Sequence, residues 1–308
     1  MTSSSISRVS SLVRVLPSAW IFASTFALVG ACSHGNTDGN GDGGAPKTDA
    51  ATSADLAFVT SDPLILARPY ESQVPTSYDG TKAVPLLVFL HGYRSTPFLD
   101  NGWFEMNALA ESAGYLLALP VGSKDANGFP HWNDGANPGD TDDVAYLDAL
   151  IKDMSARYRV DARRVFVMGH SNGGGMTYRY ACARPETVAA AIPIAGTVGD
   201  LTTCKPAALV SMLHVVGSVD GNWQGSTRAN VTFWAAHDGC GVTSDTSAAP
   251  LDLDVEQPGA ETTVERWTGC MNGTDIQLFV VGGANHHPRF GDKWIAVASA
   301  WLSAHGKP

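Results

Sequence analysis

A serine between two glycines is the first place in this sequence where chemistry can be located. Residues 169–173 read Gly-His-Ser-Asn-Gly, so Ser171 stands in a Gly-x-Ser-x-Gly pattern. An apolar run of strand length, 164–168, precedes the pattern, and a helix-like segment, 176–183, follows it. A sharp strand-to-helix turn presents its serine at the top of a sheet, and the flanking glycines leave room where side chains would collide. The pattern alone could be an ordinary glycine-rich loop, but its context favours Ser171 as a nucleophile.

A serine nucleophile needs a base and an acid, and the chain order Ser, Asp, His is typical of this arrangement. His286 and His287 follow the last strand-like segment, and either could take the proton of Ser171 and return it to a leaving group. We favour His286 and keep His287 as the alternative base. Asp220 comes just after another strand-like segment and is the predicted acid, although an aspartate before Gly221 could simply form a turn.

Two backbone N–H groups are predicted to form an oxyanion hole. Asn172 directly follows the nucleophile, so its N–H is one donor. The other donor is near Tyr93, in the loop after the buried strand 85–90, where an α/β-hydrolase has its first oxyanion loop. His170 is adjacent to Ser171 but should point away from it across the turn, so we do not predict it as the base.

Two tryptophans in polar loops are candidate substrate contacts. Trp132 lies in the loop 122–141, which is long for a connection, and Trp223 follows Asp220 in its own loop. Either ring could contact a substrate such as a sugar or a phenolic ring. Either could equally pack beneath its own loop.

Strand-like and helix-like segments alternate along the chain, as a parallel sheet requires. The predicted strands are 56–59, 68–74, 85–90, 115–120, 164–168, 188–195, 208–216, 262–267 and 276–281. The predicted helices are 103–113, 142–158, 176–183, 231–237 and 292–304. Asp142 and Asp143 open the second of these helices and are interpreted as capping groups. The pattern predicts an α/β-hydrolase fold, with a mostly parallel central sheet and helices on both faces.

The first 32 residues have the pattern of an export signal. Two arginines precede an apolar segment, 15–31, which is short for a helix that spans a membrane. The small residues directly before Cys32 resemble the lipobox of bacterial lipoproteins, so we predict lipidation at Cys32. A plain cleaved signal and a retained anchor are the alternatives. Residues 33–54 offer almost nothing to bury and predict a flexible linker, so the catalytic domain is 55–308.

Composition limits the classes of function. The chain has 308 residues, with 20 basic and 30 acidic side chains and a formal net charge of -10. This balance argues against a nucleic-acid partner and favours a neutral or weakly polar substrate. Without its leader and linker the chain keeps about 250 residues, which suits one large domain.

Four cysteines remain when Cys32 is set aside, and an even number suits an oxidising compartment. Three pairings are possible. We favour Cys182 with Cys204 and Cys240 with Cys270, because each pair closes a loop of modest length. Four free thiols are the alternative, and a metal site is disfavoured because no close Cys-x-x-Cys pair occurs.

Several stretches together resemble the polyhydroxybutyrate depolymerase and feruloyl esterase family of α/β-hydrolases, including its lipoprotein members. The matching stretches are 85–92, 142–144, 160–165, 169–173, 181–185, 195–196, 234–240, 267–270 and 282–283. The resemblance covers about residues 65–304. It implies Ser171 as nucleophile, Asp220 as acid, a histidine at 286 or 287 as base, and a bond between Cys240 and Cys270 near the site.

The sequence departs from this family in two places. Many relatives have Gly-Gly-Gly-His followed by an aromatic residue and proline, whereas here Asn285, His286 and His287 occupy that position. Relatives often have a cysteine after the His-Gly of the oxyanion loop, and here Tyr93 stands there. The identity of the base and the shape of the acyl pocket are the properties that these differences affect.

We therefore expect an exported serine esterase that works through an acyl-enzyme, without cofactor or metal, and is anchored by lipid to the outer membrane or cell surface, or released outside the cell. The resemblance implies feruloyl or acetyl esters of plant cell-wall polysaccharide, with polyhydroxyalkanoate as the alternative. A peptidase is disfavoured because the sequence has no propeller or large lid domain to select peptides. A non-catalytic surface-binding lipoprotein is disfavoured because the expected triad is intact.

Overall fold

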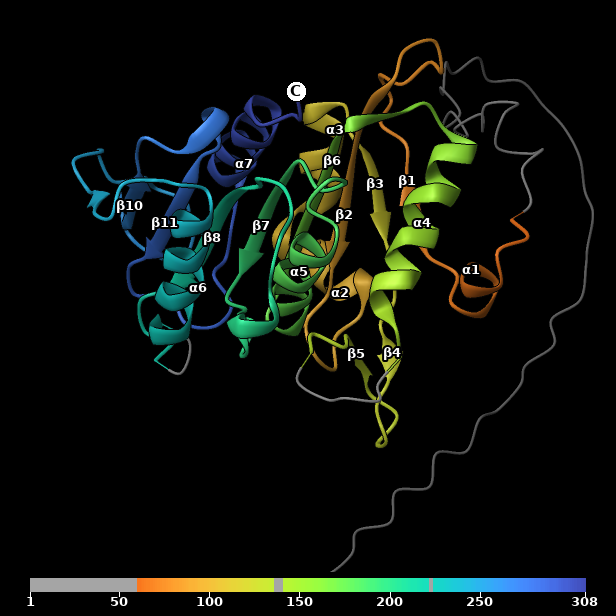
Figure 1. Cartoon of the computed structure of the whole chain (residues 1–308), viewed down its shortest axis with the longest axis horizontal. Coiled ribbons are helices and arrows are strands. Elements are labelled where there is room, and N and C mark those ends of the chain that lie inside the picture. Colours follow the sequence, from red (N-terminus) through yellow and green to blue (C-terminus); the bar gives the residue numbers. More distant parts are fainter. Residues whose placement is uncertain (1–59, 136–140, 222–223) are drawn as a thin grey trace, which may run out of the picture. The chain divides into compact units, whose positions relative to one another are not determined.

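A nine-stranded sheet organises the part of the chain that the computed structural model describes, residues 60–135, 141–221 and 224–308 (Figure 1). The strands are β1 (Glu71–Gln73), β2 (Val84–Leu90), β3 (Leu116–Leu119), β6 (Val160–His170), β7 (Ala190–Ile194), β8 (Ser211–Gly217), β9 (Ser244–Asp245), β10 (Thr262–Trp267) and β11 (Ile276–Val281). Their order is β1-β3-β2-β6-β7-β8-β11-β10-β9. The strands from β3 to β11 in this order pair in parallel, and antiparallel pairs occur only toward the edges. The mostly parallel sheet matches the prediction.

Helices cover both faces of this sheet. They are α1 (Pro63–Ala67), α2 (Pro97–Phe104), α3 (Met106–Ala113), α4 (Asp143–Arg157), α5 (Asn172–Ala183), α6 (Gln224–His237) and α7 (Asp292–Ala304), with short 3-10 turns at Leu201–Thr203 and Met271–Gly273. A two-stranded hairpin, β4 (Ser123–Lys124) and β5 (Pro130–His131), stands apart from the sheet.

The alternation of side chains along the strands divides the interior into two cores. In β2, Leu86, Val88 and Leu90 join the core beneath α4, α5 and α6, while Leu87 and Phe89 join the core beneath α2, α3 and α7. All five side chains are buried, as expected of a central strand with helices on each side.

Several elements differ from the sequence prediction. The expected helix 103–113 is two helices, because Glu105 takes a left-handed backbone conformation with φ 55° between α2 and α3. Within the expected strand 68–74 only β1 forms, and the short helix α1 precedes it. The helix after the serine begins at Asn172, four residues before the predicted start, and includes three glycines despite their weak helix propensity.

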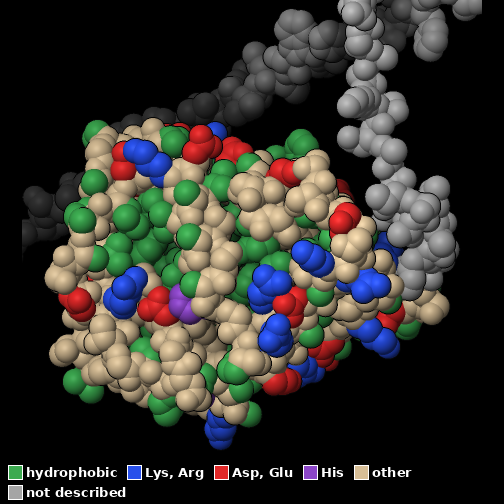
Figure 2. Space-filling view, turned by 90° about the horizontal axis from the view of Figure 1, so that it is seen from above, with side chains coloured by type: hydrophobic (Ala, Val, Ile, Leu, Met, Phe, Trp, Pro, Cys, Tyr) green, Lys and Arg blue, Asp and Glu red, His purple; other side chains and the backbone are tan. Residues whose placement is uncertain are grey.

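The predicted signal peptide 1–32, the linker 33–54 and the strand 56–59 lie outside the described residues. Within 60–135, 141–221 and 224–308, no helix is long and apolar enough to cross a membrane. The arrowheads of β3 and β7 point downward in Figure 1, so Figure 2, seen from above, shows the end at which the parallel strands begin. On that face, acidic and basic side chains are interspersed with apolar ones.

Candidate active site

The loops that carry the predicted catalytic residues lie at one edge of the sheet. Strands β2, β6, β8 and β11 all run in the same direction, so their carboxyl ends share that edge. Tyr93 follows β2, Ser171 follows β6, Asp220 follows β8 and His286 follows β11. The topology therefore brings together residues that are far apart in the sequence.

Ser171 occupies a strained turn between β6 and α5. Its backbone angles are φ 55° and ψ -119°, a region that residues other than glycine rarely adopt. Its N–H donates to the carbonyl of Ile194 at 2.8 Å, which holds the turn against β7. A Cβ on Gly169 would lie 2.4 Å from the carbonyl oxygen of Gly173, so the turn is too tight for a side chain there.

His286 bridges Ser171 and Asp220. Its Nε2 lies 2.8 Å from Ser171 Oγ, and its Nδ1 lies 2.8 Å from Asp220 Oδ2. An ionised carboxylate only accepts hydrogen bonds, so Nδ1 carries the proton and Nε2 can accept the proton of the serine. Asp220 is buried, with 7% of its surface exposed, and this shields the contact from water. The arrangement can deprotonate a serine hydroxyl.

His287 does not share this position, which corrects its prediction as the alternative base. Its ring lies edge-on to Trp103, with centroids 5.8 Å apart, and close to His170. Burial and the neighbouring rings of His170 and His286 lower the pKa of His287 to about 4. No hydrogen bond joins His287 to Ser171 in the described part of the chain.

The loop after β2 holds the peptide between Gly92 and Tyr93 in a fixed orientation. The Gly92 carbonyl accepts from the N–H of Ser95 at 3.1 Å and from Nδ1 of His91 at 2.8 Å. His91 is fixed in turn, because its Nε2 accepts from the N–H of Gly122 at 2.9 Å. Burial lowers the pKa of His91, which favours the neutral ring that this pair of bonds requires.

The backbone N–H groups of Tyr93 and Asn172 have no hydrogen-bond partner among the described residues. Asn172 is the first residue of α5, where helix geometry leaves N–H groups without an acceptor and favours negative charge. The side chain of Tyr93 points elsewhere, since its hydroxyl donates to Asp125 at 2.7 Å. Both groups are therefore available to bind an oxyanion.

The side chain of Asn172 fastens the loop after β5 to the start of α5. Its Oδ1 accepts from the N–H of Trp132 at 2.6 Å, and its Nδ2 donates to the carbonyl of Trp132 at 2.9 Å. The same Nδ2 donates to Asp134 at 3.1 Å, and Arg179 in α5 donates to the carbonyl of Asn133. Sequence reasoning used only the backbone of Asn172 and missed this second role.

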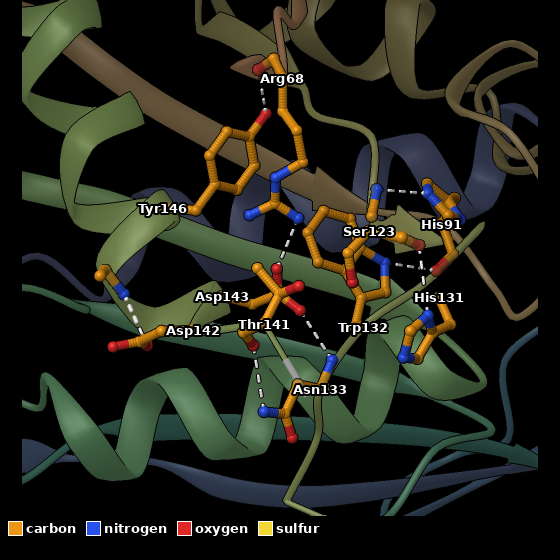
Figure 3. A network of polar contacts seen from close by, with 12 residues as sticks. Arg68, His91, Ser123, His131, Trp132, Asn133, Thr141, Asp142, Asp143 and Tyr146 are labelled. Carbon is orange, nitrogen blue, oxygen red and sulfur yellow. Dashed lines mark hydrogen bonds and ion pairs between the residues drawn. The ribbon is translucent and has the colours of Figure 1, made fainter. Parts of the chain in front are cut away.

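Trp132 is buried beneath this loop, which corrects its prediction as a substrate contact. Only 1% of its surface is exposed. Its Nε1 donates to the carbonyl of His91 at 2.9 Å, and its ring packs near the ring of His91 (Figure 3). The tryptophan therefore supports the oxyanion loop from within. The other candidate, Trp223, lies outside the described residues.

Asp143 anchors the same loop and is not a helix cap. Asp142 is the cap, since its side chain accepts from the N–H of Ala145 at 3.1 Å. The carboxylate of Asp143 is fully buried, accepting from Arg68 Nη1 at 2.6 Å and from the N–H of Asn133 at 2.7 Å (Figure 3). The prediction of two capping groups is therefore wrong for Asp143. No local pattern reveals its partner Arg68, which is 75 residues away in the sequence.

The four remaining cysteines form two disulfides with the pairing favoured from the sequence. One joins Cys182 near the end of α5 to Cys204, and the other joins Cys240 after α6 to Cys270 after β10. Among the described residues, no group of three or more His, Cys, Asp or Glu side chains is arranged to hold a metal ion.

Comparisons with known proteins relate this arrangement to esterases. Residues 73–222 match the family described as esterase PHB depolymerase. The chain is 26% identical over 223 residues to feruloyl esterase B of Piromyces equi, an alignment that covers 69% of this chain and 41% of that protein. It is 27% identical over 212 residues to the bifunctional acetylxylan esterase/xylanase XynS20E of Neocallimastix patriciarum, with 68% and 29% covered. The chain thus spans less than half the length of these curated relatives.

A solved structure supports the fold. The acetyl xylan esterase from Aspergillus awamori superposes with a TM-score of 0.58 at 18% identity, covering 75% of this chain and 92% of that one. At this identity the likeness concerns the fold alone, and it confirms the predicted α/β-hydrolase architecture. The match over residues 73–222 and the esterase relatives support the polyhydroxybutyrate depolymerase and feruloyl esterase family for this chain.

Proposed function

We propose that this protein is a serine esterase that hydrolyses carboxylic esters through an acyl-enzyme. The observation that carries the proposal is the position of His286, with one ring nitrogen 2.8 Å from Ser171 Oγ and the other 2.8 Å from Asp220. Nucleophile, base and acid with this mutual geometry are the requirements of acyl transfer.

In the first half of the reaction, Ser171 Oγ attacks the ester carbonyl while Nε2 of His286 takes the hydroxyl proton. The negative charge that develops on the carbonyl oxygen is bound by the N–H groups of Tyr93 and Asn172. When the tetrahedral intermediate collapses, His286 returns the proton to the departing alcohol, and the acyl group remains on Ser171. Asp220 stabilises the imidazolium that exists between these two proton transfers.

In the second half, a water molecule replaces the alcohol. His286 takes one proton from this water while the oxygen of the water attacks the carbonyl carbon of the acyl-enzyme. Collapse breaks the bond to Ser171 Oγ, and the proton returns from His286 to the serine. The acid is released, and the enzyme regains its starting state.

The proposed substrates are feruloyl or acetyl esters of plant cell-wall polysaccharide. The names of the two relatives support this class, since one is a feruloyl esterase and the other an acetylxylan esterase. The alternative is a polyhydroxyalkanoate or its oligomers, which the description of the matching family supports.

We also propose that the protein is exported and carries a lipid anchor at Cys32, at the outer membrane or cell surface. The two disulfides support export, because such bonds persist in oxidising compartments. Globomycin blocks cleavage of lipoprotein signals, so we expect it to stop processing. A Cys32→Ala variant with the mature mass of the wild type would contradict the anchor.

The test of the activity compares methyl ferulate, p-nitrophenyl acetate and 3-hydroxybutyrate oligomers, with Ser171→Ala as the matched control. Ferulate release that disappears in the control supports the cell-wall class. Hydrolysis of acetate alone moves the proposal to acetylated glycans, and hydrolysis of the oligomers moves it to polyesters. A fluorophosphonate probe should label the wild type and not Ser171→Ala. A wild type that the probe does not label would instead indicate a non-catalytic binding protein.

A further inference from the structure

A chain of buried polar groups runs behind the three reacting residues. His170, the last residue of β6, places Nε2 2.9 Å from the backbone carbonyl oxygen of His286. Its Nδ1 lies 3.6 Å from Asp100 Oδ2 in α2, beyond hydrogen-bond distance, so the two side chains are in contact and form an ion pair only when the ring is protonated. The same Asp100 oxygen accepts the N–H of Gly92 at 2.7 Å. The chain thus extends from the oxyanion loop, through the residue beside Ser171, to the loop that carries the base.

The chemistry of His170 in this chain is defined by its partners. A carbonyl oxygen only accepts, so Nε2 of His170 must carry a proton and donate it. The ring is 2% exposed and packs against Phe104, with centroids 4.9 Å apart, and against His287 at 4.6 Å. An apolar residue would fill such a position without the cost of burying polar atoms. A buried imidazole is therefore stable here only when it is hydrogen-bonded, and its acceptor is the backbone carbonyl of His286.

Each end of the chain fixes a backbone segment on which the proposed reaction depends. At one end, the held carbonyl belongs to His286 itself, whose ring must keep Nε2 at 2.8 Å from Ser171 Oγ. At the other end, Asp100 holds the N–H of Gly92, the residue directly before Tyr93. Asp100 is 7% exposed and also accepts from the hydroxyl of Ser95, so water cannot easily compete for it.

We propose that His170 and Asp100 are positioning residues. They hold the loop that carries His286 and the loop that carries Tyr93 at fixed positions relative to Ser171. The inference rests on the proposed function, and it assigns no substrate contact to either residue. Misplacing a reacting group by about 1 Å costs on the order of 100-fold in rate, so we expect losses of about 10- to 100-fold when the chain is broken.

Three substitutions of His170 separate positioning from packing. In His170→Gln the side-chain amide can donate from near the position of Nε2, so the bond to His286 is kept. In His170→Asn the shorter amide faces Asp100 and does not reach the His286 carbonyl, and His170→Leu has no donor. Asp100→Ala breaks the other end. The matched control is His214→Asn, which alters another fully buried histidine, in β8, whose ring bonds Tyr178 and neither loop.

The full-length protein is assayed for kcat, KM, the rate of fluorophosphonate labelling and the thermal unfolding temperature. We expect His170→Asn, His170→Leu and Asp100→Ala to lose about 10- to 100-fold in kcat and in labelling rate, with KM within about threefold. His170→Gln should keep most of both rates. His214→Asn should lower the unfolding temperature and leave kcat within about twofold.

Equal losses in all three His170 variants would overturn the inference, because the rescue by glutamine would be missing. Unchanged kcat in His170→Leu would overturn it too, and so would losses in His214→Asn that match those of the His170 variants. In each of these cases a labelled wild type leaves the proposed function standing. A wild type that does not react with the probe overturns the proposed function, and the inference with it.

Discussion

Asn172 is joined to the main chain of Trp132 by a pair of hydrogen bonds, one in each direction. Its Oδ1 accepts the Trp132 N–H at 2.6 Å, while its Nδ2 donates to the Trp132 carbonyl at 2.9 Å. The amide thus bonds this loop as a neighbouring strand would. Asn172 therefore has two roles to test: its backbone N–H is the proposed oxyanion donor, and its side chain fixes the loop beside it.

Replacing this amide tests the second role. Asn172→Ala keeps the backbone N–H but removes three hydrogen bonds to the loop, so we expect the free energy of unfolding to fall by about 1 to 3 kcal/mol. We also expect kcat/KM for esters to fall by about tenfold as the loop loosens. Urea unfolding and steady-state kinetics measure the two effects.

Asn172→Asp is the companion variant. One carboxylate oxygen can still accept from Trp132, but the other faces the Trp132 carbonyl and the carboxylate of Asp134. Repulsion should make this variant no more stable than Asn172→Ala. If Asn172→Asp is as stable as the wild type, the pair of bonds between Asn172 and Trp132 does not stabilise the fold.

The two adjacent histidines give the sharpest kinetic contrast. Only His286 lies between Ser171 and Asp220, so His286→Ala should lower kcat/KM by at least about 1,000-fold. His287→Ala should change it by less than about tenfold, because that ring packs on Trp103. Steady-state kinetics on p-nitrophenyl acetate would measure both. Comparable losses in the two variants would contradict the assignment of the base.

The fold was predictable where a segment is buried on both sides. Strands such as β2 and β7 are continuous apolar runs, so the sequence identifies them without knowledge of their partner strands. The break at Glu105 was not predictable, because the helical pattern continues through it and tertiary packing selects the left-handed residue. The hairpin β4-β5 was missed because each of its strands has only two residues.

The candidate site likewise has residues that the sequence predicts and supporting residues that it does not. Ser171, Asp220 and His286 each follow a recognisable strand, and their order along the chain matches the topology that joins them. The supporting groups depend on contacts between distant segments. Asp143 looks like a helix cap in the sequence, and only the fold pairs it with Arg68. Trp132 is equally ambiguous until its indole is seen to donate to His91.

Removing one partner of the Arg68–Asp143 pair should therefore lower the free energy of unfolding more than replacing both partners with apolar residues. Asp143→Leu leaves the Arg68 guanidinium, which is stacked on Tyr146, without its carboxylate partner, and leaves the Asn133 N–H without an acceptor. We expect a loss of about 3 to 5 kcal/mol in the free energy of unfolding.

The double variant Arg68→Met with Asp143→Leu removes the uncompensated charge. Its loss should be smaller than that of Asp143→Leu alone, and urea unfolding of the four proteins in the cycle measures the difference. Simple addition of the two single losses would contradict this coupling.

Acid sensitivity of the fold should depend on His214. This ring is fully buried in β8, and its Nδ1 is paired with the hydroxyl of Tyr178 at 2.7 Å. Burial lowers the pKa of His214 from 6.5 to about 3. Above pH 6.5 the ring is neutral in both the folded and the unfolded chain, so it adds no pH dependence there.

Between pH 6.5 and about 3 the unfolded chain binds a proton at His214 that the folded chain does not. Each unit of acidification in this window should therefore lower the free energy of unfolding by about 1.4 kcal/mol on account of this residue. His214→Asn keeps a side-chain oxygen that can accept from Tyr178 and cannot titrate. Urea unfolding between pH 7 and pH 4 should show a shallower loss of stability for this variant than for the wild type. Parallel curves would mean that His214 is protonated in the fold or reached by water, and would contradict the burial argument.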